Sequence, residues 1–390
     1  MNINSLIKKT KLNLYSSVRY SAMGISFLNT IMMLKVLNTQ DFVSFQVMLS
    51  LVVILYWFID LGSIDLVILA KDDRLQISKY SSGRTFRYIV LTFLVFFVLY
   101  FFHDPRLALI FMATNADYFN DSMITYRSVR NSLSYLTITL LVRKCVPLLF
   151  LVYLSVSNID NTFESFLLIT FFSNIPWIIR DFIALPFSMK DVFFTDSATR
   201  LNSLQQGGNF LQNLDIPLLN YLSFSVIIPP YVLGKKLFQI GSVFGQFQVP
   251  RIMDMNINDK NLPAIRKDIF YNFRLSIILT LTVIFFTELA TQEISLINLS
   301  SEDRIFAYVC LLICNLSILT TQQNSALKAL QNFRILMVST LTSTSIYLFS
   351  IAILISTWQQ KWLLLLSVLL NLGIELLFQK TALDKSIDNE

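Results

Sequence analysis

Residues 201–253 read LNSLQQGGNFLQNLDIPLLNYLSFSVIIPPYVLGKKLFQIGSVFGQFQVPRIM and decide how the rest of the chain is interpreted. Pro229 and Pro230 separate two apolar runs of about twenty residues each, the length a helix needs to cross a hydrocarbon core about 30 Å thick. At about 100° per residue, the polar side chains of the first run fall within one sector of the helix surface. They are Gln205, Asn209, Gln212, Asn213 and Asn220. We expect this polar stripe to line a water-filled cavity rather than face lipid.

Both helices of this pair carry ionisable side chains at the expected depth of the membrane. Asp215 lies two residues before Pro217, whose ring and missing N–H loosen the helical hydrogen-bond ladder. Lys235 and Lys236 lie just inside the start of the second helix. A charge at this depth costs roughly 2.5–3.5 kcal/mol on insertion scales. Such residues therefore usually face the interior of a helix bundle and usually have a function.

The composition of the whole chain also indicates a membrane protein. Of 390 residues, 54% are hydrophobic and 14% are charged, whereas soluble domains average about 25% charged residues. The three cysteines lie in apolar runs, so we expect no disulfide framework, and the single histidine, His103, argues against a metal site. The basic N-terminal segment lacks the apolar core and cleavage site of a signal peptide. The predicted fold class is all-α, a polytopic membrane protein.

Apolar runs of suitable length predict about twelve transmembrane helices. Their expected ranges are 12–34, 43–69, 88–103, 107–126, 134–154, 163–187, 201–226, 229–253, 271–290, 304–322, 333–356 and 361–379. The run 88–103 is short and polar residues interrupt 107–126, so eleven or ten is the alternative count. Six spans in each half predict an N-terminal six-helix bundle at 1–190 and a C-terminal six-helix bundle at 191–390. We interpret the segments 70–87 and 254–270 as connectors between helices.

Positive charges alternate along this layout. With the N-terminus inside, the cytoplasmic segments hold about five times as many Lys and Arg residues as the outer loops. The outer loops hold only Lys35, Arg106, Arg304 and Lys361. Both termini and the segment 70–87 are therefore predicted to be cytoplasmic. The formal net charge of +6 is mostly this bias, and it gives no reason to expect a nucleic-acid partner.

Six basic residues fall within the predicted spans: Arg19, Arg143, Lys144, Arg180, Lys235 and Lys236. All of them except Arg180, which Asp181 follows directly, are candidates for a cationic substrate-binding cavity. Arg19 shares a helix face with Tyr15 and Ser26, which makes the first helix polar on one side. The alternative for each base is snorkelling, in which a long side chain reaches the headgroup layer from a helix end.

Several carboxylates also fall within the predicted spans. Asp60, Asp117, Asp121 and Asp215 are the candidates for ion coupling or for pairing with the bases. Asp117 and Asp121 are four residues apart and share a helix face. The alternative for a carboxylate near a helix end is ordinary solvation, and this applies to Asp65 and Glu288.

Catalytic constellations are not predicted. The single histidine, His103, lies at the end of a predicted helix, where we expect no Ser/His/Asp triad around it, and no G-x-x-x-x-G-K-[ST] phosphate loop occurs in the sequence. We expect no metal site and no cofactor. A membrane glycosyltransferase or polymerase normally needs a sizeable outer loop, whereas the predicted outer loops are short. Transport is therefore favoured over catalysis.

Two hairpins of the chain carry recognisable motifs. The first hairpin carries Leu37-Asn38-Thr39-Gln40-Asp41-Phe42, Leu49-Ser50-Leu51 and Asp60-Leu61-Gly62. The second carries Asp215, Tyr231, Lys236 and Pro250-Arg251. With these motifs the chain resembles the polysaccharide transporters, the O-antigen and repeat-unit (Wzx-type) flippases of the multidrug/oligosaccharidyl-lipid/polysaccharide (MOP) exporter superfamily. The chain departs from the family pattern at Phe45, where glycine-tyrosine is expected, and it is shorter than most relatives.

This resemblance implies a MATE- and MurJ-like layout of two six-helix bundles and a flippase for polyprenyl-diphosphate-linked oligosaccharides in the bacterial inner membrane. The implied partners are the lipid-linked oligosaccharide, membrane lipids and other polysaccharide-assembly proteins. Bases in a cavity would offset desolvation of the diphosphate, and the amide side chains would bond the sugar. A coupling ion, proton or sodium, would be felt by the buried carboxylates.

Three alternatives remain open from the sequence. A drug or metabolite antiporter of the same superfamily would share the fold, and most cargoes of that class are cations. A lipid-II-type flippase is the nearest neighbour of the favoured function. A membrane glycosyltransferase or O-antigen polymerase is the enzymatic alternative.

Overall fold

The computed structural model describes most of the apolar runs of the chain. The described residues are 21–61, 63, 74–123, 133–157, 162–194, 203–204, 207, 210–236, 269–271, 273–278, 280–282, 284–285, 288, 300–329, 333–358 and 360–388. Within these ranges all regular secondary structure is helical. Helices satisfy their backbone hydrogen bonds internally, as a bilayer requires. The predicted all-α class is confirmed.

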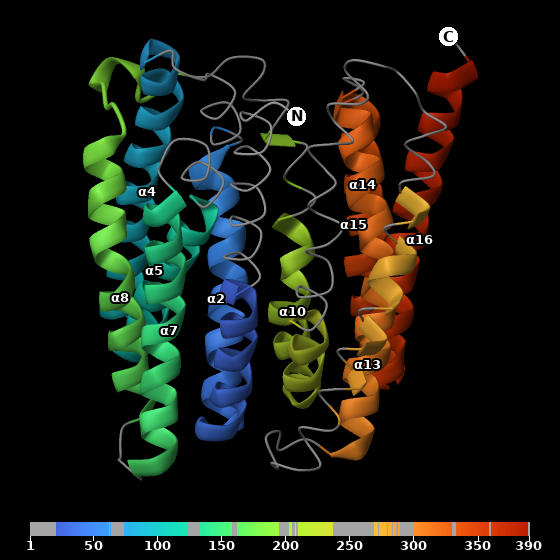
Figure 1. Cartoon of the computed structure of the whole chain (residues 1–390), viewed down its shortest axis with the longest axis horizontal. Coiled ribbons are helices and arrows are strands. Elements are labelled where there is room, and N and C mark those ends of the chain that lie inside the picture. The colour runs from blue at the N-terminus through green and yellow to red at the C-terminus, as the bar shows by residue number, and fades with distance from the viewer. Residues whose placement is uncertain are drawn as a thin grey trace, which may run out of the picture. The chain divides into compact units, whose positions relative to one another are not determined.

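The chain divides into two compact units, Met1–Gln206 and Gly207–Glu390. The first unit contains a helix over Ser21–Val36 and five labelled α-helices (Figure 1). These are α2 (Thr39–Asp60), α4 (Arg74–Phe102), α5 (Pro105–Ser122), α7 (Leu133–Ser157) and α8 (Thr162–Ala184), followed by the short 3-10 helix η1 (Met189–Asp191). The helix α5 contacts α2, α4 and α8.

The second unit has a broken first part and a regular second part. The broken part consists of η2 (Gln212–Leu214), α10 (Asp215–Tyr221), η3 (Ser225–Ile227) and a helix over 228–236. The regular part consists of a shorter helix over Ile269–Thr282, then α13 (Ser301–Cys314), α14 (Leu316–Ala329), α15 (Phe333–Trp358) and α16 (Lys361–Asp388). The helix α16 contacts α13, α14 and α15.

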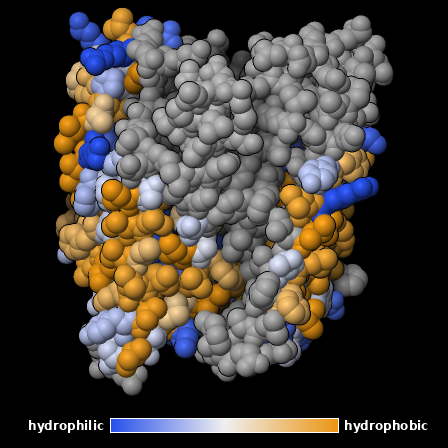
Figure 2. Space-filling model, viewed as in Figure 1, coloured by the Kyte–Doolittle hydropathy of each residue, from blue (hydrophilic) through white to orange (hydrophobic). Residues whose placement is uncertain are grey.

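Seven helices among the described residues are long and apolar enough to cross a membrane, judged by length and composition. They are Thr39–Asp60, Arg74–Phe102, Thr137–Ser157, Phe163–Ala184, Ser301–Asn324, Ile335–Leu354 and Lys361–Thr381. Large apolar side chains such as Phe93, Phe101 and Ile183 are exposed on them, which suits contact with lipid. Figure 2 shows hydrophobic residues over much of the described surface of the first unit. The chain is a multi-pass membrane protein.

Local signals in the sequence explain several helix ends. Asn38 caps α2 with its side-chain oxygen, which accepts a hydrogen bond of 2.8 Å from the Asp41 amide. Asp104 caps α5 in the same way, and Pro105 occupies the first helical position, where its missing N–H costs nothing. At its other end α2 stops at Leu61, whose φ of 44° is left-handed. The helix α2 thus covers residues 43–60 of the predicted span 43–69, and residues 62 and 64–69 lie outside the described residues.

The helix α5 is an interior helix, which explains why its sequence signal is weak. Ala108, Phe111, Asn115 and Phe119 are all buried on it, since α2, α4 and α8 surround it. A helix covered by other helices does not need a lipid-facing apolar surface. The helix expected at 107–126 is therefore observed as Pro105–Ser122 despite its polar side chains.

The interpretation of segment 70–87 as a connector is wrong for residues 74–87. These residues form the first part of α4, which is longer than the predicted span 88–103. Ser81 donates a hydrogen bond of 2.8 Å to the Pro186 carbonyl, and Ser82 accepts one of 2.8 Å from the Ser188 amide. The polar groups of this segment form hydrogen bonds with residues more than a hundred positions away in the sequence. No local pattern reveals these partners, so the segment resembles a loop in the sequence.

Residues 212–227 correct the prediction of one regular helix over 201–226. The turn of 3-10 helix at Gln212–Leu214 changes the angular step per residue, so a single 100° periodicity does not hold across it. The chain reverses before the two prolines, where Ser223 has a φ of 62°. Pro229 and Pro230 then lie in the first turn of the helix over 228–236, where proline is tolerated.

Candidate functional site

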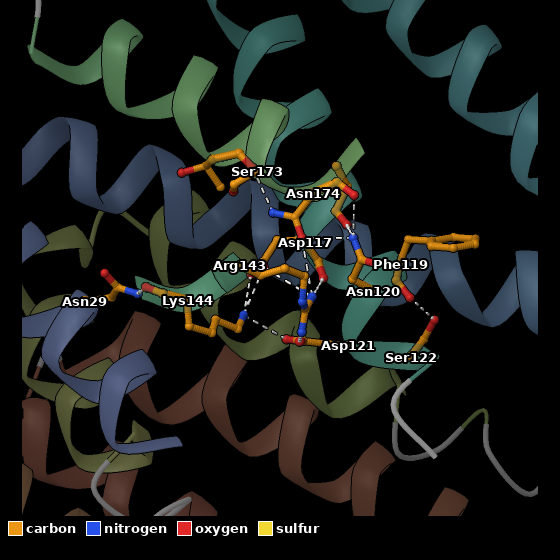
Figure 3. Close-up of polar contacts among 12 residues, drawn as sticks. Asn29, Asp117, Phe119, Asn120, Asp121, Ser122, Arg143, Lys144, Ser173 and Asn174 are labelled. Atoms are coloured by element: carbon orange, nitrogen blue, oxygen red, sulfur yellow. Dashed lines mark hydrogen bonds and ion pairs between the residues drawn. The ribbon is translucent and has the colours of Figure 1, made fainter. Parts of the chain in front are cut away.

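Four charged residues form a cluster inside the first unit, shown in Figure 3. Asp117 and Asp121 lie one turn apart on α5, and Arg143 and Lys144 are adjacent on α7. Arg143 Nη2 donates to Asp121 Oδ1 at 2.7 Å. Lys144 Nζ donates to both oxygens of Asp117 at 2.9 Å and to Asp121 Oδ2 at 3.3 Å. We call these four residues the charge quartet, and its formal charges balance.

Three asparagines support the charge quartet from beside it. Asn120 on α5 donates to the side-chain oxygen of Asn174 on α8 at 2.9 Å. The same oxygen lies 3.4 Å from Arg143 Nη1, which also donates to the Asp117 carbonyl at 3.2 Å. Asn29, on the helix over Ser21–Val36, donates to the Lys144 carbonyl at 2.9 Å. Side chains from three other helices therefore fix the position of the two bases on α7 (Figure 3).

Exposure differs strongly within the charge quartet. The Arg143 side chain is 0% exposed and that of Lys144 is 11% exposed, whereas those of Asp117 and Asp121 are 22% and 38% exposed. Arg143 Nε has no hydrogen-bond acceptor among the described residues. A buried donor without a partner costs about 1–3 kcal/mol. The arginine thus retains one unused donor in a place where its other two nitrogens are engaged.

Asp60 forms a second buried ion pair of the first unit. Its Oδ1 accepts a hydrogen bond of 3.1 Å from Arg84 Nε, and both side chains are less than a tenth exposed. Arg84 also donates to Ser122 Oγ at 2.9 Å. Arg87 donates to the Ile59 carbonyl at 2.9 Å and so caps the end of α2. This arrangement ties α2, α4 and α5 together.

Asp215 is the centre of a cluster in the second unit. Its Oδ2 accepts hydrogen bonds from Tyr231 OH at 2.5 Å, from Tyr347 OH at 2.9 Å and from Lys235 Nζ. Its Oδ1 accepts a hydrogen bond of 2.7 Å from the Ile216 amide. The carboxylate is buried, and its donors come from α10, from the helix over 228–236 and from α15. We call Asp215, Tyr231, Lys235 and Tyr347 the aspartate cluster.

The structure places the other predicted residues as follows. Gln212 donates to Thr344 Oγ1 at 3.4 Å and Asn213 to the Phe210 carbonyl at 3.3 Å, both partly buried. Asn220 is exposed, and Lys236 lies half-buried beside Lys235. Arg19, Gln205 and Asn209 lie outside the described residues. Arg180 stacks on the ring of Tyr135, with 3.6 Å from its guanidinium carbon to the ring centre.

All four candidate carboxylates form ion pairs with bases. The sequence separates these residues into a cationic and an acidic group, whereas the structure pairs Asp117, Asp121 and Asp215 with predicted cationic residues. Arg84, Asn174 and Tyr347 were not predicted. Arg84 was missed because segment 70–87 was read as a connector, and Tyr347 because nothing local marks a tyrosine in an apolar run as a partner of Asp215.

Among the described residues no group of three or more His, Cys, Asp or Glu side chains is arranged to hold a metal ion. Cys310 and Cys314 are one turn apart on α13 with 4.0 Å between their sulfur atoms, and both are free.

No protein-family model and no curated protein sequence matches the chain. Solved structures do match it over nearly its whole length. It is similar to the lipid II flippase MurJ in an inward closed conformation, with a TM-score of 0.65 and 10% identity over 95% of this chain and 87% of that one. It is similar to an outward-facing multidrug resistance MATE family transporter of the MOP superfamily, with a TM-score of 0.62 and 9% identity over 98% of this chain and 97% of that one.

A third match is a MOP superfamily transporter from Pyrococcus furiosus Vc1, for which a reversed polarity of the binding pocket suggests a different function. Its TM-score is 0.60 at 9% identity, over 96% of both chains. At such low identities the likeness shows the fold alone. The chain therefore has the helical fold of MATE and MurJ transporters, and these structural neighbours are transporters and flippases rather than enzymes.

Proposed function

We propose that this protein is a flippase that moves polyprenyl-diphosphate-linked oligosaccharide repeat units of a surface polysaccharide across the bacterial inner membrane. The two family-like hairpins and the fold shared with the MurJ flippase support the proposal. The two six-helix bundles would alternate access to the two membrane faces, with both termini in the cytoplasm. Other proteins of polysaccharide assembly would supply and use the cargo.

The observation that carries this proposal is the charge quartet. A buried arginine or lysine without a counter-charge destabilises a protein by about 3–5 kcal/mol. A cavity for an anionic headgroup therefore needs an internal anion when the cargo is absent. Asp117 and Asp121 provide it, because their four oxygens lie against Arg143 and Lys144. We infer that the diphosphate takes the place of these carboxylates on the two bases.

The chemistry of the quartet suits this exchange. Guanidinium groups bind phosphate oxygens through paired N–H donors, and Arg143 Nε still lacks an acceptor. Lys144 adds a compact positive charge beside it. Amide side chains such as Gln212 and Asn213 would bond the hydrated glycan, while the polyprenyl tail stays in the hydrocarbon. No covalent bond of the cargo is formed or broken.

A cation-coupled drug or metabolite antiporter is the second candidate, and one observation favours it. The carboxylates of the quartet are more exposed than the bases, so a cationic cargo would meet Asp117 and Asp121 first. The similarity to MATE transporters fits this candidate as well. The two functions make opposite predictions for the same four side chains.

The test is complementation of a deletion strain. Deletion should abolish the surface glycan and leave lipid-linked repeat units accumulated on the inner leaflet. For a flippase, Arg143→Gln and Lys144→Gln should each impair restoration of the glycan at least about tenfold, since each removes more than about 1.4 kcal/mol of headgroup attraction. Arg143→Lys should be partly tolerated because a cation is kept.

The matched variants are Asp117→Asn and Asp121→Asn, with membrane levels of every variant measured beside export. For the flippase these variants should export more than the Gln variants at equal protein level. For the antiporter they should be the inactive ones, and the deletion should sensitise cells to cationic drugs without loss of glycan. A deletion strain that lacks the complete repeat unit would instead favour the glycosyltransferase or polymerase.

A further inference from the structure

Lys235 is paired with the buried carboxylate of Asp215 in the second unit. Its Nζ donates to Asp215 Oδ2, and it lies 4.6 Å from the centre of the Tyr231 ring. Lys235 and Tyr231 are four residues apart on the helix over 228–236, so they share one helix face. The Lys235 ammonium is thus held by the Asp215 carboxylate and the Tyr231 ring, and the lysine side chain fixes it to the helix over 228–236.

Three oxygens converge at this point. Besides Asp215 Oδ2, the hydroxyls of Tyr231 and Tyr347 lie 2.8 Å apart and both bond the carboxylate. Hard cations are bound by several oxygen ligands of this kind, carboxylates foremost. Here the hydroxyls donate to the carboxylate, and the positive charge beside it belongs to a lysine. Lys235 therefore already supplies the positive charge at Asp215 Oδ2.

The hydrogen-bond donors to Asp215 come from three helical elements. The helix α10 contributes Asp215 itself, α15 contributes Tyr347, and the helix over 228–236 contributes Tyr231 and Lys235. On α13 the buried thiols of Cys310 and Cys314 are the electrostatic neighbours of the pair. Asp215 is 1% exposed and its counter-charge is therefore required for stability.

We propose that Lys235 is a built-in counter-cation of Asp215, so that the carboxylate of the second unit binds no Na⁺ from solution. The consequence for transport rests on the proposed function: Asp215 would not couple export of the cargo to a sodium gradient. Lys235, whose side chain is 31% exposed, is then engaged by Asp215 and does not bind the cargo diphosphate. Its role is to position and neutralise Asp215.

The experiment measures thermal unfolding of the purified full-length protein in detergent, in NaCl and in choline chloride at equal ionic strength. The wild type should melt at the same temperature in both salts. Lys235→Met should lower the melting temperature by at least about 5 °C in choline, because it leaves a buried carboxylate unpaired. Addition of Asp215→Asn should restore most of this loss, since a neutral amide needs no counter-charge. Lys235→Arg should melt close to the wild type.

In the Lys235→Met variant, the carboxylate of Asp215 should become able to bind Na⁺. NaCl should raise the melting temperature of Lys235→Met relative to choline chloride, and this gain should disappear in the double variant. The control is Lys361→Met, which removes a lysine paired with Glu302 and Asp303 in the same unit, and which Asp215→Asn should not rescue. If Lys235→Met is too unstable to purify, membrane abundance of the single and double variants reports the same rescue.

Two results would overturn the proposal. One is a sodium-dependent stabilisation of the wild type that Asp215→Asn removes. The other is failure of Asp215→Asn to rescue Lys235→Met. Neither readout measures glycan export, so either melting-temperature prediction can fail while the flippase proposal stands. Failure of the flippase proposal would in turn leave the assignment of Lys235 as the counter-cation of Asp215 intact.

Discussion

At the scale of single residues, several charges within the described helices are matched by an opposite charge nearby. Asp60 pairs with Arg84 and Asp121 pairs with Arg143. In each pair the acid and the base lie on two different helices. Removing one partner of such a pair leaves the other charge uncompensated in a low-dielectric interior. The pairs therefore stabilise the packing of the helices, whether or not they also serve transport. Asp60 and Arg84 show this most clearly, since both are almost fully buried.

We predict that Arg84→Met destabilises the first unit by about 3–5 kcal/mol, because the buried carboxylate of Asp60 would lose the base that donates to it. Thermal or denaturant unfolding in detergent measures the change. Asp60→Asn in the same background should recover part of the loss. An Arg84→Met variant as stable as the wild type would mean that Asp60 is solvated or neutral in the folded protein.

Arg106 is the matched control for this prediction. It bridges Asp41 at 2.9 Å and Glu164 at 2.8 Å, but its side chain is 43% exposed. Exposed ion pairs contribute about 0.2–1 kcal/mol, so Arg106→Ala should have a much smaller effect than Arg84→Met. Equal losses for the two variants would argue against burial as the cause.

At the scale of elements, the helix over 228–236 approaches α13 so closely that only glycine fits at the crossing. A Cβ at Gly234 would lie 2.7 Å from the Ala307 carbonyl oxygen and 2.9 Å from Cys310 Cβ. Real Cβ atoms do not come so near, and a backbone oxygen has little freedom to move. Small residues at helix crossings of this kind are typical of membrane proteins. The contact holds Tyr231 and Lys235 against the rest of the second unit.

We predict that Gly234→Ala destabilises the second unit by about 1–3 kcal/mol through overpacking. Gly373→Ala on α16 is the control, because no atom lies within 4 Å of the added Cβ there. It should be neutral or stabilise by about 0.4–1 kcal/mol, since alanine is the better helix former. Thermal unfolding of both variants checks the pair, and a Gly234→Ala protein at least as stable as Gly373→Ala would show that the two helices can separate freely.

The success of sequence-based prediction also differs by element. Apolar length and end signals such as Asn38 and Asp104 predict the long helices well, because the information is local. Residues 74–87 and 212–227 were misread because their structure depends on distant partners, as Ser81 with Pro186 and Asp215 with Tyr347 show. The same applies to the site. Its charged members stand out in an apolar sequence, but which acid meets which base is decided by helix packing.

At the scale of the whole molecule, the alternation of positive charge and the helix lengths support one topology. The predicted six spans per half and the cytoplasmic position of both termini remain predictions, and each depends on the other. An even number of spans returns the chain to its starting side, whereas one missed or added span would reverse every loop after it. The helix α4 begins at Arg74 instead of residue 88. This moves the predicted start of the third span but leaves the predicted order of inside and outside segments unchanged.

We predict that a reporter enzyme active only outside the cytoplasm is silent when fused after Lys79 and after Lys385. Both sites lie in segments rich in Lys and Arg, which the positive-inside bias retains in the cytoplasm. A fusion after Asp104, in the tight connection between α4 and α5, should be active and shows that the reporter is exported. Activity after Lys79 would reverse the first hairpin, while activity after Lys385 alone would require an odd number of spans between the two sites. The second outcome would remove the parallel relation between the halves and, with it, the alternating-access scheme proposed for the flippase.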